Sequence, residues 1–111
     1  MKVTNCSSVN LKVKAVALLA PLILIFSGVA CAADTKSGAT IYQHHCQNCH
    51  GVSGQGDFPG MPDFSRGEGL FQPNSTLMNT IKRGKGVMPA FEGLLTDEEI
   101  LDVIAYLRTL R

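Results

Sequence analysis

The C-terminal part of the chain shows the clearest helical alternation of apolar and polar positions. Its apolar residues recur every three or four positions: Ile100, Val103, Ile104, Leu107 and Leu110. Thr96 and Glu99 precede this stripe with the spacing of a capping box, and acidic residues fill the first turn, where the helix dipole favours them. The pattern therefore predicts an amphipathic helix that begins at Thr96 and carries Arg108 and Arg111 in its last turn.

A second helix is predicted further towards the N-terminus, with Ser37 as its N-cap and its last turn near Cys46. Gly38, Tyr42 and Cys46 follow one another at intervals of four residues and so share one face. Gly38 costs this helix roughly 1 kcal/mol of stability relative to alanine. Because glycine has no side chain, it allows a partner helix to approach closely, and we expect that partner to be the C-terminal helix.

Glycine and proline interrupt residues 51–74 too often for a long helix or strand. A loop of this length is uncommon in a compact domain unless it has a function, so we expect it to wrap a bound group. After it, Asn74 or Ser75 is expected to cap a short helix that ends at Arg83, before Gly84. The pattern as a whole predicts an all-α fold of short helices joined by Gly/Pro-rich loops.

The N-terminal segment has the order of a bacterial export signal. Its basic front contains Lys2, Lys12 and Lys14, and the apolar run of residues 15–26 is too short for the about 20 residues of a membrane-spanning helix. Ala30-Cys31-Ala32 then resembles an A-x-A cleavage site. We therefore predict a signal peptide in residues 1–33, cleaved near Ala32 or Ala33, and a periplasmic domain in residues 34–111.

Two alternatives would tether the protein to a membrane instead. The residues Gly28-Val29-Ala30-Cys31 resemble the lipid-attachment box of bacterial lipoproteins, although such boxes usually have leucine three residues before the cysteine. An uncleaved signal would also act as an anchor. Membrane association is therefore expected only if Cys31 is lipidated or the signal remains uncleaved.

Charge and size narrow the class of protein further. The chain has 10 basic and 9 acidic residues, and three of the basic ones lie in the signal, so residues 34–111 carry a formal charge of −2. This balance argues against nucleic acid as a partner. A domain of this size buries a small core that rarely supplies more than about 3–5 kcal/mol of stability, so we expect an additional stabilising feature.

This stabilising feature is predicted by the motif Cys46-Gln47-Asn48-Cys49-His50, which has the pattern of a c-type haem attachment site. On a helical turn, both thiols can form thioethers to one haem while the histidine becomes an axial iron ligand. Cys6 and Cys31 lie in the predicted signal, so Cys46 and Cys49 are too few for a disulfide framework. A zinc site would need further ligands, and a thioredoxin-like site would need a βαβ unit; neither pattern is present.

The sixth iron ligand decides between electron transfer and substrate chemistry. Five side chains are candidates after the signal: His44, His45, Met61, Met78 and Met88. Both histidines precede the attachment motif on the same predicted helix, Met61 follows His50 too closely, and Met78 sits at a helix position typical of core filler. Met88 lies in a Gly- and Pro-flanked loop, where Pro89 favours an extended backbone, and is the predicted ligand.

Taken together, CQNCHG, GMPDF, VMPAF and LTDEEILDVIAYLRTL resemble the class I monohaem cytochromes c. The resemblance is to the bacterial branch with small periplasmic carriers and cbb3-type cytochrome c domains, and it spans residues 34–111. It implies a cytochrome c fold wrapped around one covalent haem c, with Cys46 and Cys49 as its thioether residues. It implies axial ligation by His50 and Met88, and a proline carbonyl, best matched by Pro62, that accepts a hydrogen bond from His50.

With both axial positions filled, the expected function is one-electron transfer between redox protein partners, without catalytic residues or a small-molecule substrate. Lys82, Arg83 and Lys85 could form a basic rim for an acidic partner, or simply complement the dipole at a helix end. Two other functions stay open from the sequence. The chain could be a haem subunit of a larger dehydrogenase or oxidase, or, if Met88 did not bind, an enzyme or gas-binding protein with an open iron site.

Overall fold

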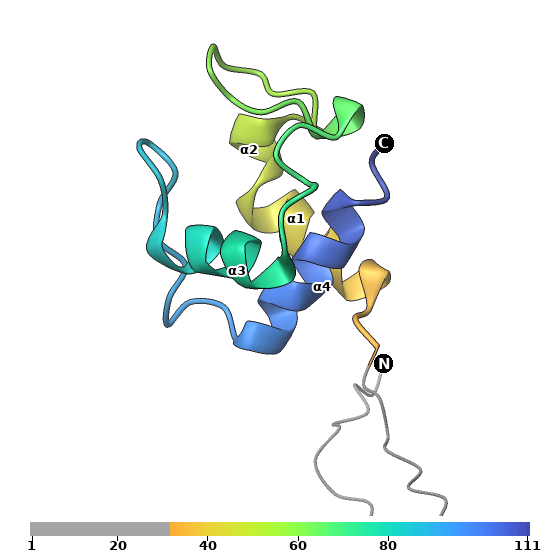
Figure 1. The fold of residues 1–111 in the computed structure, drawn as a ribbon, viewed down its shortest axis with the longest axis vertical. Coiled ribbons are helices and arrows are strands. Elements are labelled where there is room, and N and C mark those ends of the chain that lie inside the picture. Colours follow the sequence, from red (N-terminus) through yellow and green to blue (C-terminus); the bar gives the residue numbers. More distant parts are fainter. Residues whose placement is uncertain (1–31) are drawn as a thin grey trace, which may run out of the picture. The chain divides into compact units, whose positions relative to one another are not determined.

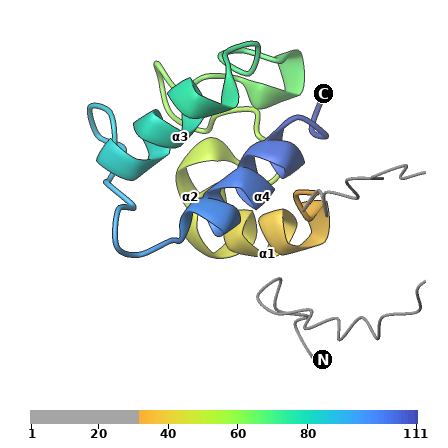
Figure 2. The same ribbon diagram turned by 60° about the horizontal axis from the view of Figure 1, so that its bottom comes forward.

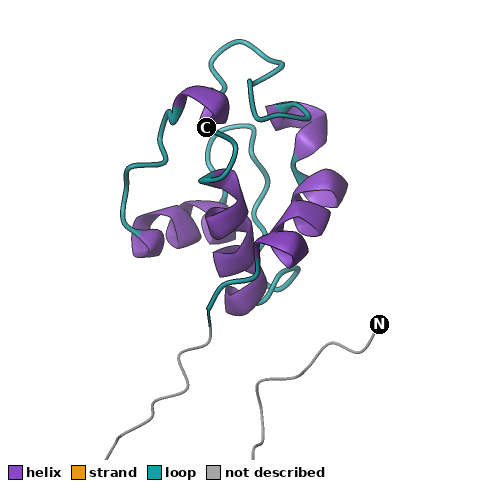
Figure 3. Cartoon of the chain, turned by 90° about the vertical axis from the view of Figure 1, so that its right-hand side faces the viewer, coloured by secondary structure: helices purple, strands orange, loops and turns teal. Residues whose placement is uncertain are grey.

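The computed structural model describes residues 32–111, so the predicted signal lies outside the described residues except for its last two positions. Residues Ala33–Arg111 form one compact unit. Its helices are, in chain order, α1 (Thr35–His45), α2 (Gln47–His50), the 3₁₀ helix η1 (Phe64–Arg66), α3 (Asn74–Arg83) and α4 (Asp97–Leu107). The described chain contains isolated β-bridges but no strand, which confirms the all-α prediction (Figure 3). None of the helices in residues 32–111 has the length and apolarity needed to cross a membrane.

The core forms where α1 crosses α4 (Figure 2). Tyr42 from α1 and Val103 and Leu107 from α4 are buried in one apolar cluster with two loop residues, Phe64 and Leu70. The rings of Tyr42 and Tyr106 lie 5.4 Å apart in a tilted arrangement. This packing confirms that the C-terminal helix is the partner of the Gly38 face of α1.

The N-terminus of α1 differs from the prediction. Asp34, not Ser37, is the N-cap: its side chain accepts a hydrogen bond from the backbone nitrogen of Lys36, 2.8 Å away. The backbone nitrogen of Asp34 also donates to the carboxylate of Asp102, 2.7 Å away on α4. This contact gives the buried Asp102 carboxylate a partner and fixes the start of α1 against the centre of α4.

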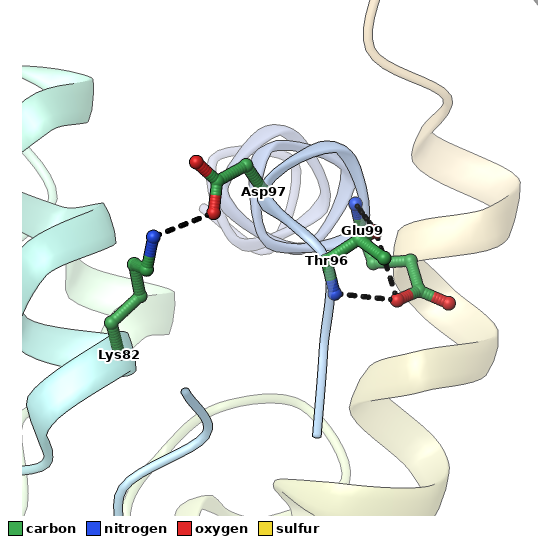
Figure 4. A network of polar contacts seen from close by, with 4 residues as sticks. All are labelled: Lys82, Thr96, Asp97 and Glu99. Carbon is green, nitrogen blue, oxygen red and sulfur yellow. Dashed lines mark hydrogen bonds and ion pairs between the residues drawn. The ribbon is translucent and has the colours of Figure 1, made fainter. Parts of the chain in front are cut away.

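The capping box of α4 is confirmed. The Thr96 hydroxyl accepts from the Glu99 backbone nitrogen at 3.2 Å, and the Glu99 carboxylate accepts from the Thr96 backbone nitrogen at 2.8 Å (Figure 4). The helix ends earlier than predicted, with Arg108 as its C-cap. Arg108 keeps a right-handed backbone, with φ of −71°, and its guanidinium donates to the carbonyl oxygen of Gln72 at 3.0 Å.

Helix α3 has the predicted span, but its N-cap is Pro73 and neither Asn74 nor Ser75 caps it. Proline fixes the extended backbone before the first turn, and its carbonyl accepts from the backbone nitrogen of Leu77 at 3.2 Å. At the other end, Lys82 forms an ion pair with Asp97 of α4 at 2.7 Å (Figure 4). This hydrogen bond raises the pKa of Lys82 and joins α3 to the start of α4.

The loop after α2 folds back on itself and contains η1, which the sequence pattern did not predict. The backbone nitrogen of Phe64 donates to the carbonyl of Gly54 at 2.7 Å. Gly54 has a φ of +77°, and a Cβ there would lie 2.9 Å from both the Phe64 Cβ and the Leu110 side chain. The glycine therefore permits both the left-handed backbone and the burial of the Phe64 ring.

Thr96→Ala is expected to lower the free energy of unfolding by about 1 kcal/mol, because it leaves the Glu99 amide of the first turn without its acceptor. Urea unfolding of the haem-loaded protein measures this loss. Thr40→Ala removes an exposed threonine from α1 whose hydroxyl bonds to the preceding turn of its own helix, so it is the matched control. Equal stability of the two variants would contradict the role of the cap.

Candidate functional site

The central feature of the domain is a cavity of about 770 Å³ between the helices and the long loop. Its apolar wall comes from four parts of the chain: Tyr42 of α1, Leu70 of the loop, Phe91 after α3, and Val103 and Leu107 of α4. The volume lies in the range of cofactor pockets, about 300–1,000 Å³. A smaller cavity of about 80 Å³ shares part of this lining. The long loop thus wraps a space large enough for a bound group, as its length predicted.

The predicted attachment motif borders both cavities. Cys46 is the junction between α1 and α2, with φ of −120°, so the motif occupies a short helical turn of its own. The backbone nitrogens of Cys49 and His50 donate to the Cys46 carbonyl at 3.2 and 3.0 Å, which holds this turn closed. Both thiols are free; Cys46 and His50 line the large cavity, and Cys49 joins them at the small one. Burial, followed by the proximity of Cys49, raises the pKa of Cys46 to about 11, so this thiol is neutral at neutral pH.

His50 is buried, with its ring stacked on Phe64 at a centroid distance of 4.8 Å. Burial lowers the pKa of the imidazole, which favours the neutral, metal-binding form. Among the described side chains, its Nδ1 is the buried polar atom that lacks a hydrogen-bond partner. Pro62 lines the same cavity, but the predicted hydrogen bond from Nδ1 to its carbonyl is not formed in this structure.

Met88 reaches the same site from the loop at residues 84–91. Two backbone hydrogen bonds between Lys85 and Met88, of 3.2 and 3.1 Å, close this loop into a tight turn. Gly84 has a φ of +72°, and a Cβ at this position would lie 2.5 Å from the Met88 carbonyl oxygen. Met88 lines both cavities together with His50, so a thioether and an imidazole face one space from separate segments.

The other candidate ligands are placed less favourably, with one exception. His44 and His45 are exposed on α1, although His45 contacts the edge of Phe91 and borders the small cavity. Met78 lines neither cavity. Met61 lines both, contrary to the expectation from its short distance to His50 in the sequence.

This donor set fits one covalently bound haem. The large cavity supplies an apolar space lined by the free thiol of Cys46 and by an imidazole with an unpaired Nδ1, and the free thiol of Cys49 borders the small cavity beside them. A soft thioether is the second donor, and His with Met is the ligand pair of cytochromes c. The fit rests on side chains from four separate segments of the chain.

Comparison with known proteins decides the family. Residues 33–107 match the family model of cytochrome c oxidase, cbb3-type, subunit III. Cytochrome c6 of Thermosynechococcus vestitus is 34% identical over 94 residues, which cover 81% of this chain and 82% of that protein. Cytochrome c6 of Pyropia yezoensis is 36% identical over 88 residues, covering 73% of this chain and 76% of that protein.

A solved structure agrees. Cytochrome c6 from the diatom Phaeodactylum tricornutum superimposes with a TM-score of 0.57 at 28% identity, covering 69% of this chain and 93% of that one. This chain belongs to the monohaem class I c-type cytochromes. The cytochrome carries one covalent haem c and functions as an electron carrier between protein partners.

Tyr42 has a role in this cytochrome that the sequence pattern did not reveal. Its hydroxyl donates to the carbonyl oxygen of Gly51 at 2.7 Å, and Gly51 directly follows His50. Burial, then the proximity of Cys46, raises the pKa of Tyr42 to about 12, so the phenol stays protonated and remains a donor. The four-residue spacing to Cys46 placed Tyr42 on the correct face, but its hydrogen bond depends on the turn at Gly51, where φ is +83°.

Proposed function

We propose that Cys46 and Cys49 form the two thioether bonds to the haem, and that His50 and Met88 are its axial iron ligands. The observation that carries this proposal is the convergence of His50 and Met88, from α2 and from the loop after α3, on one apolar cavity that Cys46 also lines, with Cys49 beside them at the small cavity. The local turn held by the Cys46 carbonyl presents the motif as a unit. The bound haem supplies reversible one-electron chemistry at iron.

The protein residues determine how that chemistry is used. Two protein ligands leave no coordination position for a substrate, so the chain is proposed to be a carrier and not an enzyme. The Tyr42 and Phe64 contacts fix the His50 turn, while the Lys85–Met88 hydrogen bonds fix the opposite ligand loop. Ligands held on both sides limit the rearrangement that accompanies a change of charge. A thioether ligand also favours the reduced state relative to a second histidine.

Pro62 is proposed to accept the hydrogen bond from His50 Nδ1 in the haem-loaded protein. A buried imidazole nitrogen without a partner is costly, and ligating histidines usually donate their second ring N–H to a carbonyl or carboxylate. Pro62 borders the cavity beside His50 and has a carbonyl but no competing backbone N–H. Such a bond would orient the ring and increase its basicity as a ligand.

Export to the periplasm, with cleavage near Ala32 or Ala33, is part of the same proposal. It is supported by the basic front, the apolar run and the small residues before Asp34. The compact unit begins at Ala33, next to the proposed cleavage site. Mass spectrometry of the purified protein tests this directly, because a lipid on Cys31 or an uncleaved signal gives a different mass.

The proposed partners are redox proteins, with neither nucleic acid nor a small-molecule substrate involved. Beside Met88, Val87 is 86% exposed and Lys85 is exposed, which offers a small apolar and basic rim at the ligand loop. Lys82 contributes less to this rim than predicted because it is paired with Asp97. Transient redox contacts are small, under about 1,200 Å².

A second candidate function is a haem subunit of a larger oxidase or dehydrogenase. It is favoured by one observation: the matching family model is named for a subunit of a cbb3-type cytochrome c oxidase. Native mass in high salt separates the candidates. A mobile carrier runs at the mass of a single small haem protein, whereas a subunit co-purifies with a large partner.

Met88→Ala is expected to abolish the weak long-wavelength methionine-to-iron charge-transfer band of the oxidised protein, because it removes the thioether ligand. The reduced variant is expected to bind carbon monoxide rapidly, whereas the wild type binds it slowly. Absorption spectra and carbon monoxide mixing measure both effects.

Two methionine controls make this test specific. Met78→Ala removes a methionine that borders neither cavity, and Met61→Ala removes one that borders both. Both controls are expected to keep the band. If Met61→Ala abolishes the band and Met88→Ala retains it, the assignment of the axial ligand is wrong.

A further inference from the structure

An exposed aromatic side chain and three arginines lie together at the end of the domain formed by η1 and the C-terminal residues. Phe71 is 79% exposed, and the guanidinium carbon of Arg111 lies 5.2 Å from its ring centroid. Arg66 ends η1, and Arg108 donates to the carbonyl of Gln72, the residue after Phe71. We name Arg66, Phe71, Arg108 and Arg111 the Phe71 surface.

The backbone of Gly67 forms the floor of this surface. A Cβ at Gly67 would lie 3.2 Å from the Phe71 ring and 3.7 Å from the Arg111 side chain. The ring and the arginine therefore lie beside the same short stretch of backbone, and the guanidinium lies over the ring. Such a pre-arranged aromatic–arginine pair loses less conformational entropy on binding than two mobile side chains would.

The arginines of the Phe71 surface are not paired with a carboxylate within the described domain. Arg66, Arg108 and Arg111 form no ion pair among residues 32–111, where Lys82 and Asp97 form the ion pair of the structure. The nearby Glu68 carboxylate accepts from the backbone nitrogen of Asp63 at 3.0 Å and forms no ion pair with these arginines, although its position two residues from Arg66 reduces the net positive charge of the surface. Three arginines therefore present positive charge around an apolar ring.

This surface is distinct from the rim at the ligand loop. In Figures 1 and 2, η1 and the C-terminal end lie on the side of the domain away from the loop at residues 84–91. Its inner neighbours still belong to the haem cavity, because Leu70 and Gln72, which flank Phe71, both line it. A protein docked here would rest on the wall of the cavity, opposite the Met88 loop.

From these observations we propose that the Phe71 surface is a second docking site for an acidic protein, with Phe71 as its apolar anchor. Phenylalanine and arginine are enriched in the cores of protein interfaces, and three unpaired cations select a partner of negative charge. A carrier with a docking site on each side of its haem can bind two partners at the same time, because they do not compete for one surface.

A peptide titration of the ¹⁵N-labelled, haem-loaded protein tests this proposal. The probe is an acidic peptide of alternating glutamate and leucine, compared with a glutamate-only peptide and with anionic phosphatidylglycerol vesicles. Amide shifts are expected at residues 66–72 and 108–111, and the leucine-containing peptide is expected to bind more tightly than the glutamate-only one. Shifts confined to residues 82–88, or binding of the vesicles alone, would overturn the proposal.

Variants of exposed residues add a quantitative test. Phe71→Ser and the double variant Arg66→Gln/Arg111→Gln are each expected to weaken peptide binding about tenfold, as for interface hot spots. Arg83→Gln removes an exposed arginine near the ligand loop and is the matched control, expected to leave binding unchanged. Equal affinity of all variants overturns the docking site, while an intact haem spectrum in each shows that the electron-carrier function is unaffected.

Discussion

Gly38→Ala is expected to lower the free energy of unfolding by about 3 kcal/mol, because the added methyl group meets the backbone of α4. An alanine Cβ at this position would lie 2.5 Å from the carbonyl carbon of Asp102 and closer still to its oxygen. It would also lie 2.9 Å from the Cβ of Tyr106. The obstacle is thus the backbone of α4, which cannot rotate away as a flexible side chain would.

Helix propensity acts in the opposite direction but is too small to compensate. Replacing glycine by alanine inside a helix gains roughly 1 kcal/mol. To accept the methyl group, α1 must move away from α4, which loosens Tyr42 against Val103 and Leu107 and stretches the Asp34–Asp102 hydrogen bond of 2.7 Å. Because Tyr42 also holds Gly51, the displacement reaches the turn that presents His50.

Urea unfolding of the haem-loaded protein measures the effect of Gly38→Ala. The control is Thr40→Ala, which places an alanine at an exposed position two residues further along α1. We expect the control to change stability by less than about 0.5 kcal/mol. A Gly38→Ala protein as stable as the control would show that the helices separate without cost.

The sequence predicted best where neighbouring residues determine the structure. The capping box of Thr96 and the apolar stripe after it depend on contacts within four residues, and both are confirmed. The predicted start of α1 was wrong although the cap itself is local: the Asp34 side chain accepts from Lys36, and the Asp34 backbone nitrogen adds a contact to Asp102, 68 residues away. The predicted end of α4 was also wrong: Arg108 is the C-cap, and the backbone nitrogen and hydroxyl of Thr109 both donate to the Tyr106 carbonyl.

The same distinction applies to the candidate site. The attachment motif is contiguous, so its turn could be predicted, and the Gly- and Pro-flanked loop pointed to Met88, which lines the cavity. The stacking of Phe64 on His50 could not be predicted, because it requires the loop to fold back through η1. Met61 reaches the cavity through that same folding, which its distance to His50 along the chain does not reveal.

The double substitution Cys46→Ala/Cys49→Ala is expected to eliminate covalent haem attachment completely. These are the free thiols of the described domain, and both border the small cavity with His50. Without them, the haem would be held only by its axial ligands and by apolar contacts with the cavity wall. We therefore expect haem to dissociate when the protein is denatured, and the purified chain to lack the mass of a haem.

The two single variants should differ, because the two thiols have different surroundings. Cys46 is half-buried at the α1–α2 junction and lines the large cavity, whereas Cys49 is exposed and borders only the small one. Each single variant retains one thioether, so haem is expected to remain attached through one bond. Cys46→Ala is expected to be the less stable of the two, since it also removes a side chain packed against the core.

Mass spectrometry after denaturation, together with haem staining of a denaturing gel, distinguishes these forms. Asn48→Ala changes an exposed residue between the two cysteines and is the matched control, expected to keep the full haem mass. If the double variant retained haem through denaturation, the thioether assignment would be wrong. The double variant could also keep the methionine-to-iron band in its native spectrum and lose haem only after denaturation. In that case His50 and Met88 would hold the haem iron without covalent bonds, so attachment and ligation would be separable.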